Sequence, residues 1–336
     1  MAFLARTCGT HLWQRCANIG LIAAALLGGA AVGGCASASA HSESVGATPA
    51  NTGPQQMTFH TPDEAVGYLY IAALEQDSAG MQDLFGPHMK EFGSGNHQQD
   101  KADFQRLAAS MQLRRGLDRN DDGSYTLVVG AQNWNFPAPL VKDGENWRFD
   151  TDTGIKELAA RKISHDEREA VYVCRQYVIA QGAYKALNPD KSAEETYAAK
   201  LASTTGQHDG LYWDAKPGEP ESPFGPLVAR AAERGYTTAS AQRKEPYRGY
   251  FFRILTAQGP NAQGGALSYL VAGKLTKGFA LVAFPAEYGK SGVHTFIVNQ
   301  DGVVYEKDQG PNSAATARSM ESFDPGQGWT KIQDEE

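Results

Sequence analysis

Helical periodicity gives way to short strand patterns twice along this chain, and this order constrains the fold more than any other feature. In the first helical segment, apolar residues recur at spacings of three and four, at Ala65, Val66, Leu69, Tyr70 and Ala73. Strand patterns follow near residues 125–149. A second helical segment, residues 164–187, precedes strands between 248 and 306. Helices followed by strands predict an α+β fold, with helices packed on antiparallel sheets in two domains.

The first domain is expected to begin at a well-marked helix start. Thr61 is a capping residue, Pro62 takes the first helical position and Glu64 completes a capping box. This helix is expected to end near Asp77. A short second helix is expected to close at Phe85-Gly86-Pro87, and a third to span residues 102–115. The expected strands are residues 125–129, 134–141 and 147–149, with Asp143-Gly144 as the hairpin turn before the last of them.

The second domain is expected to open with another capping box, Ser164 to Glu167, followed by an amphipathic helix to about Leu187. Cys174 lies on the apolar stripe of this helix, so we expect a buried thiol rather than a reactive one. Asn299–Gly302 is the clearest turn among the later strands. Those strands are expected at residues 248–256, 267–271, 279–285, 293–298 and 303–306.

The first 34 residues have the features of a lipoprotein signal peptide. Arg6 and Arg15 precede an uncharged run, residues 19–34, which is shorter than the about 20 apolar residues of a membrane span. The run ends in Val-Gly-Gly followed by Cys35, which resembles the lipobox of bacterial lipoproteins. That resemblance implies that Cys35 becomes the first mature residue and carries the lipid. The alternative is ordinary cleavage at an Ala-x-Ala site within residues 36–40, which leaves a soluble protein.

A lipid on Cys35 implies a protein that is exported and anchored in the membrane of the cell envelope. Ala36 resembles the residue that permits sorting to the outer membrane, so we expect the protein there, facing the periplasm. A soluble periplasmic or secreted protein is the alternative. Residues 35–56 are rich in Ala, Ser, Gly, Pro and Thr and are expected to form a flexible tether. Cys8 and Cys16 leave with the signal peptide, so no intramolecular disulfide is expected.

Composition excludes several function classes. The chain has 336 residues, of which 31 are Lys or Arg and 38 are Asp or Glu, giving a formal net charge of −7. This charge does not draw a protein to phosphate backbones, so we expect no nucleic-acid partner. With 41% apolar residues, the chain can bury a large core in roughly two domains. No sequence motif points to a cofactor, and we expect none.

Three segments together resemble one bacterial family. They are VVGAQNWNFPAPLVKDGENWRFDTDTGIKEL (128–158), GLYWDAKPGEPESPFGPLV (210–228) and GYFFRILTAQGPNAQGGALSYLVAGKLTKGFALVAFPAEYGKSGVHTFIVNQDGVVYEKDQGP (249–311). They are similar to the bacterial envelope family known as domain of unknown function 2950. The resemblance covers nearly all of residues 57–332. It implies no mechanism, because none is assigned to that family.

Each half of the chain also resembles a broader fold. The segment PLVKDGENWRFDT (139–151), coming after helices, resembles the cystatin-like or nuclear transport factor 2-like cone, in which a curved sheet wraps a helix. This implies a cystatin-like domain over residues 57–160. Residues 161–332 resemble the globular head of type IV pilin-like proteins, where a long amphipathic helix precedes the strands. The helix here lacks the hydrophobic membrane segment that polymerises pilins, which argues against assembly into a fibre.

One short segment gathers residue types that are used in hydrolysis. Glu287, Tyr288 and His294, with Lys290 and Ser291 between them, supply a general base, a nucleophile and an orienting group within eight residues. The alternative is a β-hairpin with a Gly-Lys-Ser-Gly turn, in which Ser291 and His294 need not converge. The alternative is favoured, so no catalytic residue is assigned and the protein is expected not to be an enzyme.

Two acidic groupings suggest metal ligands but lack complete ligand sets. Asp118, Asn120 and Asp122 match alternate ligand positions of an EF-hand loop, yet position 12 holds valine instead of a bidentate glutamate. A solvated acidic turn is therefore favoured. His208 and Asp209 lack the three-ligand spacing that catalytic zinc requires. We expect no bound metal.

Aromatic residues provide the best candidates for ligand binding. Tyr212 and Trp213 lie in a segment rich in Gly and Pro, residues 206–226, and would form a sugar or peptide platform if they are exposed. We therefore expect a non-enzymatic binding or assembly module with an envelope protein or glycan as its partner. The alternatives are a periplasmic hydrolase acting through the segment around Glu287 and, more weakly, a carrier of a small apolar ligand near Trp134 and Trp147.

Overall fold

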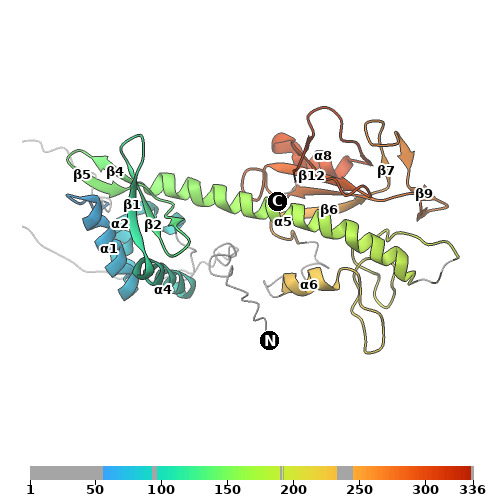
Figure 1. Ribbon diagram of the computed structural model, residues 1–336, viewed down its shortest axis with the longest axis horizontal. Helices are drawn as coiled ribbons and strands as arrows, with labels where there is room; N and C mark the ends of the chain where they lie inside the picture. The colour runs from blue at the N-terminus through green and yellow to red at the C-terminus, as the bar shows by residue number, and fades with distance from the viewer. Residues whose placement is uncertain (1–55, 93–96, 190, 192, 233–244, 334–336) are drawn as a thin grey trace, which may run out of the picture. The chain divides into compact units, whose positions relative to one another are not determined.

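The computed structural model describes residues 56–92, 97–189, 191, 193–232 and 245–333 (Figure 1). The expected signal peptide, the expected lipid anchor at Cys35 and residues 35–55 of the expected tether lie outside the described residues. Along the stretches that are described, no helix combines the length and the apolar character needed to cross a membrane.

The chain divides into two compact units, an N-terminal unit that ends at Leu158 and a C-terminal unit that begins at Ala159. The division falls inside α5 (Thr151–Leu187), which is continuous. The helix that was expected to begin at Ser164 therefore begins at Thr151. Asp150 caps it, because its carboxylate accepts hydrogen bonds from the backbone N–H and the hydroxyl of Thr153 at 3.2 and 2.8 Å. Strong helix formers fill residues 156–162, so the helix continues through the capping box that was predicted at Ser164 to Glu167.

Helices form the first part of the N-terminal unit. The hydroxyl of Thr61 accepts a hydrogen bond from the Glu64 N–H at 3.2 Å, as predicted, and the Glu64 carboxylate accepts one from the His60 N–H at 3.0 Å. The first helix ends at a left-handed Gln76, and Asp77 then caps the second. The third predicted helix starts five residues earlier than expected, as α4. The helical elements are α1 (Pro62–Glu75), α2 (Ser78–Phe85), η1 (Gly86–His88), α3 (Met89–Phe92) and α4 (His97–Leu113).

An antiparallel sheet completes this unit. Its strand order is β1-β2-β4-β5, and β3 also pairs with β2. The strand expected at 134–141 is two short strands, because Pro137 and Pro139 cannot donate to a ladder. Asp143 pairs with Asn146, so the turn residues are Gly144 and Glu145, one position later than predicted. The strands are β1 (Arg115–Arg119), β2 (Tyr125–Val129), β3 (Trp134–Asn135), β4 (Leu140–Asp143) and β5 (Asn146–Phe149).

The helices of the N-terminal unit pack on one face of its sheet (Figure 1). Phe85 and Phe149 have ring centroids 5.5 Å apart, and Phe136 lies 6.1 Å from Phe85 and 5.7 Å from Phe149. Phe92 stacks on Phe85 at 4.7 Å. Aromatic rings therefore fill the space between the helices and the strands.

The C-terminal unit is built on a second antiparallel sheet, with strand order β15-β13-β12-β11-β6. Every residue of β11, an interior strand of this sheet, is buried, because both faces of the sheet are covered. The predicted turn over Asn299–Gly302 is confirmed, since the Gly302 N–H donates to the Asn299 carbonyl at 3.0 Å with φ of +77° at Gly302. The strands are β6 (Tyr250–Leu255), β11 (Ala280–Pro285), β12 (His294–Asn299), β13 (Tyr305–Asp308) and β15 (Thr330–Lys331).

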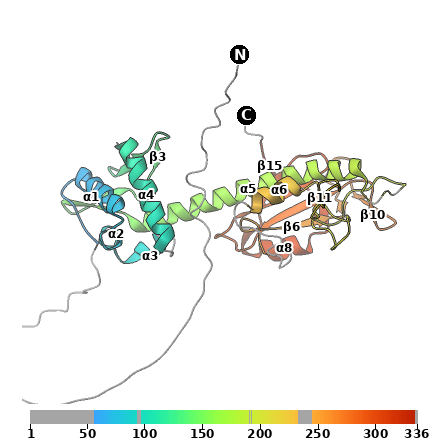
Figure 2. The same ribbon diagram turned by 90° about the horizontal axis from the view of Figure 1, so that it is seen from below.

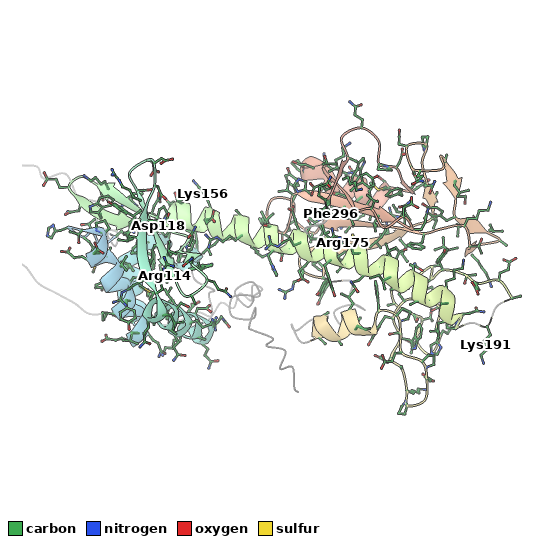
Figure 3. The ribbon with its side chains drawn as sticks, in the orientation of Figure 1. Arg114, Asp118, Lys156, Arg175, Lys191 and Phe296 are labelled. Carbon is green, nitrogen blue, oxygen red and sulfur yellow. The ribbon has the colours of Figure 1, made fainter. Side chains whose placement is uncertain are left out.

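Helices α5 and α8 (Ser313–Ser319) cover opposite faces of this sheet (Figure 2). Phe296 lies on the α5 face, between sheet and helix (Figure 3), and packs in one cluster with Cys174 and Tyr177. Cys174 is fully buried, and burial raises the pKa of its thiol to about 12. The prediction that Cys174 is a buried core residue is therefore confirmed.

Smaller elements surround the second sheet. The strand expected at 267–271 is broken at Tyr269, which turns inward and donates a hydrogen bond to the Gln258 side chain at 2.9 Å. Strands β7 (Ala257–Gln258), β8 (Leu267–Ser268) and β14 (Ser322–Phe323) form a three-stranded sheet, and β9 (Leu270–Val271) pairs with β10 (Lys274–Leu275). The remaining elements are α6 (Gly225–Ala232) and η2 (Gly310–Asn312).

The observed architecture is a mixed α+β fold in two units. Helices pack on several sheets, and among the strands of the described residues only β14 and β7 pair in parallel.

Candidate functional site

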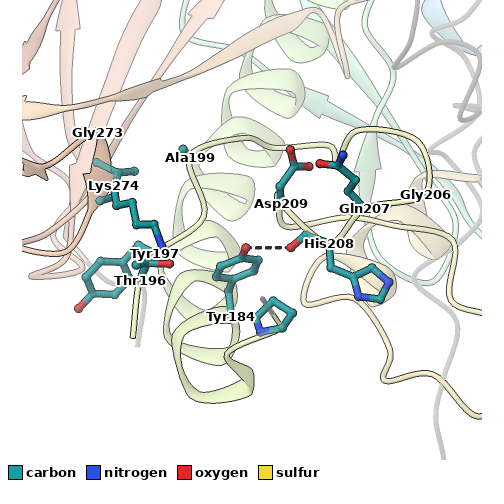
Figure 4. Close-up of a pocket in the computed structure, with 12 residues that line it drawn as sticks. Tyr184, Thr196, Tyr197, Ala199, Gly206, Gln207, His208, Asp209, Gly273 and Lys274 are labelled. Atoms are coloured by element: carbon teal, nitrogen blue, oxygen red, sulfur yellow. Dashed lines mark hydrogen bonds between the residues drawn. The ribbon is translucent and has the colours of Figure 1, made fainter. Parts of the chain in front are cut away.

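A pocket of about 320 Å³ lies in the C-terminal unit (Figure 4). Four parts of the chain meet around it: the end of α5 at Tyr184, Pro189 with the stretch 196–199, the loop 206–209, and the β9–β10 hairpin at 273–275. Its volume lies at the low end of the about 300–1,000 Å³ range of small-ligand pockets. The pocket therefore suits one ring-sized unit of a ligand rather than a long chain.

The helix end of the pocket is tied to the loop opposite. Tyr184 is buried, and its hydroxyl donates a hydrogen bond to the His208 carbonyl at 2.8 Å, as Figure 4 shows. One turn earlier, the buried amide of Gln181 donates to the Ala198 carbonyl and accepts from the Ala198 N–H, both at 2.8 Å. A buried amide that pairs in both directions holds the chain beside it in one position.

The hairpin is fixed to the same wall. The Tyr197 N–H donates to the Leu275 carbonyl at 2.8 Å, so this residue pairs with the edge of β10. The Tyr197 ring meets Phe279 edge-on, with centroids 4.8 Å apart, and the ammonium of Lys185 lies 5.0 Å from the ring centroid. Backbone pairing and ring packing therefore hold this part of the pocket in place.

Asp209 organises the loop on the far side. Its carboxylate accepts hydrogen bonds from Lys200 at 2.5 Å and from the backbone and hydroxyl of Thr204 at 2.7 and 2.9 Å. Burial raises the pKa of Asp209, but the hydrogen bonds from Lys200 and Thr204 outweigh it and the net pKa is lowered. Asp209 is therefore ionised at neutral pH and acts as a clamp within the loop.

The pocket lining mixes polar and apolar groups. Lys274 extends from the hairpin toward Thr196, whereas the His208 ring turns away from Tyr184 (Figure 4). Gln207 stands exposed at the rim. Pro189 and Ala199 supply apolar surface, and Leu275 lies buried behind the lining. Such a lining can bind and orient a ligand through hydrogen bonds and contact.

The predicted aromatic platform anchors the neighbouring loop. Trp213 is buried, stacks on His208 with centroids 4.5 Å apart, and donates its indole N–H to the Pro220 carbonyl at 3.1 Å. The Tyr212 hydroxyl donates to Asp214 at 2.5 Å. Neither Tyr212 nor Trp213 lines the pocket. Trp213 reaches the pocket only through its stack with His208, one of the lining residues.

Trp134, the candidate in the N-terminal unit, is partly buried and meets Phe136 edge-on at 6.0 Å. Trp147 packs against Tyr125 at 5.3 Å. These contacts belong to the core of that unit and give no support to a carrier of apolar ligands.

The predicted hydrolytic residues are distributed among separate partners. Glu287 pairs with Lys290 at 2.8 Å, and both side chains are exposed. The Ser291 hydroxyl donates to the Glu287 carbonyl at 3.1 Å and accepts from the Glu287 N–H at 3.0 Å. The predicted Gly-Lys-Ser-Gly turn is thus present, and the serine hydroxyl is engaged in closing it.

Tyr288 and His294 lie near the same end of strands β12 and β13, but they contact different partners. The Tyr288 hydroxyl donates to Asp308 at 3.1 Å, and Asp308 is the cross-strand partner of His294. The Nδ1 atom of His294 lies 3.2 Å from an oxygen of Glu167 on α5. The structure therefore orients His294 with a carboxylate that the sequence prediction did not include.

The acidic groupings also have partners of their own. The Asp122 carboxylate accepts hydrogen bonds from the backbone and hydroxyl of Ser124 at 2.9 and 2.6 Å, and these bonds lower the pKa of Asp122. The Asn120 amide donates to Ser124 and Thr126, so this segment is a side-chain-capped turn between β1 and β2. Within the described ranges, no three His, Cys, Asp or Glu side chains are grouped so that they could hold a metal ion.

The pocket was missed by sequence reasoning, although one signal pointed to it. The Gly- and Pro-rich segment 206–226 is long for a connection, and long connections with defined structure are often functional. The other contributors, Tyr184, Tyr197 and Lys274, have no local pattern that sets them apart from core or surface residues.

The chain is thus a two-unit α+β protein with a pocket of about 320 Å³ in its C-terminal unit. Residues 56–332 match the model of the family described as "Protein of unknown function (DUF2950)". This match covers well over half of the chain, so the chain belongs to that family. No curated protein and no solved structure matches it.

Proposed function

We propose that this protein is an exported envelope lipoprotein that acts as a non-enzymatic binding or assembly module, with the pocket beside Tyr184 as its binding site. The proposal rests on one observation, which is that hydrogen bonds hold the wall of that pocket in place. Gln181, Tyr184 and Asp209 each fix a different part of it by hydrogen bonds. A pocket that is formed before binding reduces the ordering cost of binding, which suits recognition.

The N-terminal sequence supports the location. A charged start, an uncharged run and the small residues before Cys35 are the parts of a lipoprotein signal peptide. In this proposal, lipid on Cys35 holds the protein in the outer membrane facing the periplasm. Residues 35–56 then act as the tether between the lipid and the folded units.

The finer fold assignments belong to the same proposal. For the N-terminal unit, helices on one face of an antiparallel sheet support a cystatin-like domain over residues 57–160. For the C-terminal unit, a long helix along an antiparallel sheet supports a pilin-like domain over residues 161–332. An envelope protein or a glycan is the partner proposed for this module.

A periplasmic hydrolase acting through Glu287, Tyr288 and His294 is the second candidate. The contact between Glu167 and His294 favours it, because a carboxylate that orients an imidazole is a common feature of general bases. The Ser291 hydroxyl argues against it, because this group already donates a hydrogen bond to the Glu287 carbonyl. If Glu287→Gln and His294→Ala both restore every phenotype of a deletion strain, the hydrolase idea fails.

Photo-crosslinking in intact cells tests the proposed binding function. A benzoylphenylalanine placed at Gln207, on the pocket rim, should give light-dependent adducts in the envelope fraction. The matched control places the same group at Ser319, an exposed residue of α8. Adducts at Gln207 alone are expected. Absence of adducts at Gln207, or equal adducts at both positions, would contradict a binding site in this pocket.

A further inference from the structure

We propose that the pocket beside Tyr184 binds a single saccharide unit of an envelope glycan. This inference rests on the proposed binding function and specifies its ligand. The polar lining, the apolar lining and the strand edge beside the pocket support it.

The polar lining matches a ligand rich in hydroxyl groups. The Gln207 amide both donates and accepts, the Lys274 ammonium donates, and the Thr196 hydroxyl does either. Sugar hydroxyls are likewise donors and acceptors, so side chains of this kind can pair with the hydroxyls of a bound sugar. An apolar side chain in the same place would leave such groups without partners, at a cost in binding.

The apolar lining matches the other surface of a sugar. A pyranose ring presents C–H groups on its faces, and these pack on flat apolar surfaces. Pro189 and Ala199 provide apolar contact surface in the lining, and the ring of Tyr197 adds to it. Small-ligand sites commonly combine contact surface of this kind with a few placed polar groups.

The strand edge beside the pocket argues against a peptide. An extended peptide usually binds by adding a strand to an exposed sheet edge. In this protein, β10 pairs on one side with β9, and on its other side Leu275 accepts the hydrogen bond from the Tyr197 N–H at 2.8 Å. The chain itself therefore occupies the place where a peptide strand would add to β10.

Isothermal titration calorimetry on the purified exported protein tests this inference with three separate probes. The first is peptidoglycan glycan fragments freed of stem peptides, the second is the delipidated core oligosaccharide of lipopolysaccharide, and the third is the free stem peptides. We expect saturable binding of the first or the second probe. Which of the two binds then identifies the source of the saccharide.

Variants locate that binding. Gln207→Ala and Lys274→Ala should each weaken it about tenfold, because each removes a hydrogen-bonding partner of the sugar. Lys277→Ala is the matched control, since Lys277 is an exposed lysine just after the same hairpin and does not line the pocket. Its binding should equal that of the wild type. Equal weakening in all three variants would overturn the assignment to this pocket.

The probes also separate two kinds of failure. Binding of the stem peptides alone, with crosslinks still formed at Gln207, would overturn the saccharide assignment and leave the binding function standing. Absence of binding to every probe, together with absence of crosslinks, would overturn both.

Discussion

Glu167 and His294 are 127 positions apart in the chain, yet Oε1 of Glu167 lies 3.2 Å from Nδ1 of His294. The same oxygen accepts hydrogen bonds from the backbone N–H groups of Val293 and His294, at 2.8 and 3.0 Å. The Tyr250 hydroxyl donates to the His294 carbonyl at 2.9 Å. One carboxylate on α5 therefore accepts hydrogen bonds from the backbone N–H groups at the start of β12, and these bonds fix the helix to the sheet.

Removing this carboxylate should destabilise the C-terminal unit. We expect Glu167→Ala to lower the free energy of unfolding by about 2–3 kcal/mol, because two sheltered N–H groups lose a charged acceptor. Glu167→Gln keeps an acceptor oxygen and should cost about 1 kcal/mol. Glu287→Ala is the control, since its ion pair with Lys290 is exposed to solvent and should change the stability little. Urea denaturation measures all three, and equal losses in Glu167→Ala and Glu287→Ala would contradict this role.

Two glycines should respond in opposite directions to alanine. A β-carbon on Gly292 would overlap the phenol of Tyr250, which is fully buried, so Gly292→Ala should cost about 1–3 kcal/mol or more. A β-carbon on Gly182, in α5, meets nothing within 4 Å. Gly182→Ala should therefore stabilise the protein by about 0.5–1 kcal/mol. Thermal denaturation compares the two, and a stable Gly292→Ala would show that Tyr250 is free to move.

His165 should make stability depend on pH. Burial, followed by the nearby guanidinium of Arg248, lowers the pKa of His165 below its ordinary value of 6.5. Between the two pKa values the unfolded chain binds a proton that the folded chain does not. Stability should therefore fall as the pH drops through 6.5 and level off below the folded pKa. His165→Gln should make this fall shallower in urea titrations at several pH values.

His88 provides a control of opposite sign. A hydrogen bond to Asp152 raises the pKa of His88, so this group stabilises the N-terminal unit below its unfolded pKa and loses that effect as the pH rises through its folded pKa. His88→Gln should therefore remove a gain at low pH. If both histidine variants change the pH dependence in the same sense, the assigned directions are wrong.

The thiol of Cys174 should resist chemical labelling. Its burial and its pKa of about 12 keep it protonated and covered across the neutral range. In a Cys35→Ser protein produced without residues 1–34, Ellman's reagent should find no rapidly reacting thiol at pH 8, and one thiol after denaturation in guanidinium. Rapid reaction of the folded protein would show that this part of the core opens readily.

The lipid anchor can be tested directly. Metabolic labelling with a palmitate analogue should mark the wild-type protein and leave the Cys35→Ser variant unmarked. Cys16→Ser, inside the expected signal peptide, is the matched control and should remain labelled. Equal labelling of wild type and Cys35→Ser would refute the anchor and favour the soluble exported form.

Elements with a local signature were predicted from the sequence. Thr61 with Glu64 marked the start of α1, and Asn299–Gly302 marked a turn, because each depends on residues within four positions. Strand β1 was missed, since its sequence of Arg, Gly, Leu, Asp and Arg shows no apolar alternation. It is a strand because it pairs along its whole length with β2.

The candidate site was harder to predict because its parts are distant in sequence. Tyr184 belongs to the stripe of a helix, and Lys274 belongs to a short hairpin. Neither residue has a local sequence pattern that marks it as part of a site. The hydrolytic candidates had the opposite problem, because Glu287 and His294 are close in sequence but pair with different partners.

The sequence by itself determined the order of helices and strands, the burial of Cys174 and the family to which the chain belongs. The first two follow from periodicity and capping, which act over a few residues at a time. The family follows from the resemblance of three long segments to its members and from the match over residues 56–332. Only the tertiary structure decided that Glu167 meets His294 and that four separate segments enclose a pocket beside Tyr184. Such contacts form when packed elements bring distant side chains together, and the residue pattern of one segment does not show which other segment it packs against.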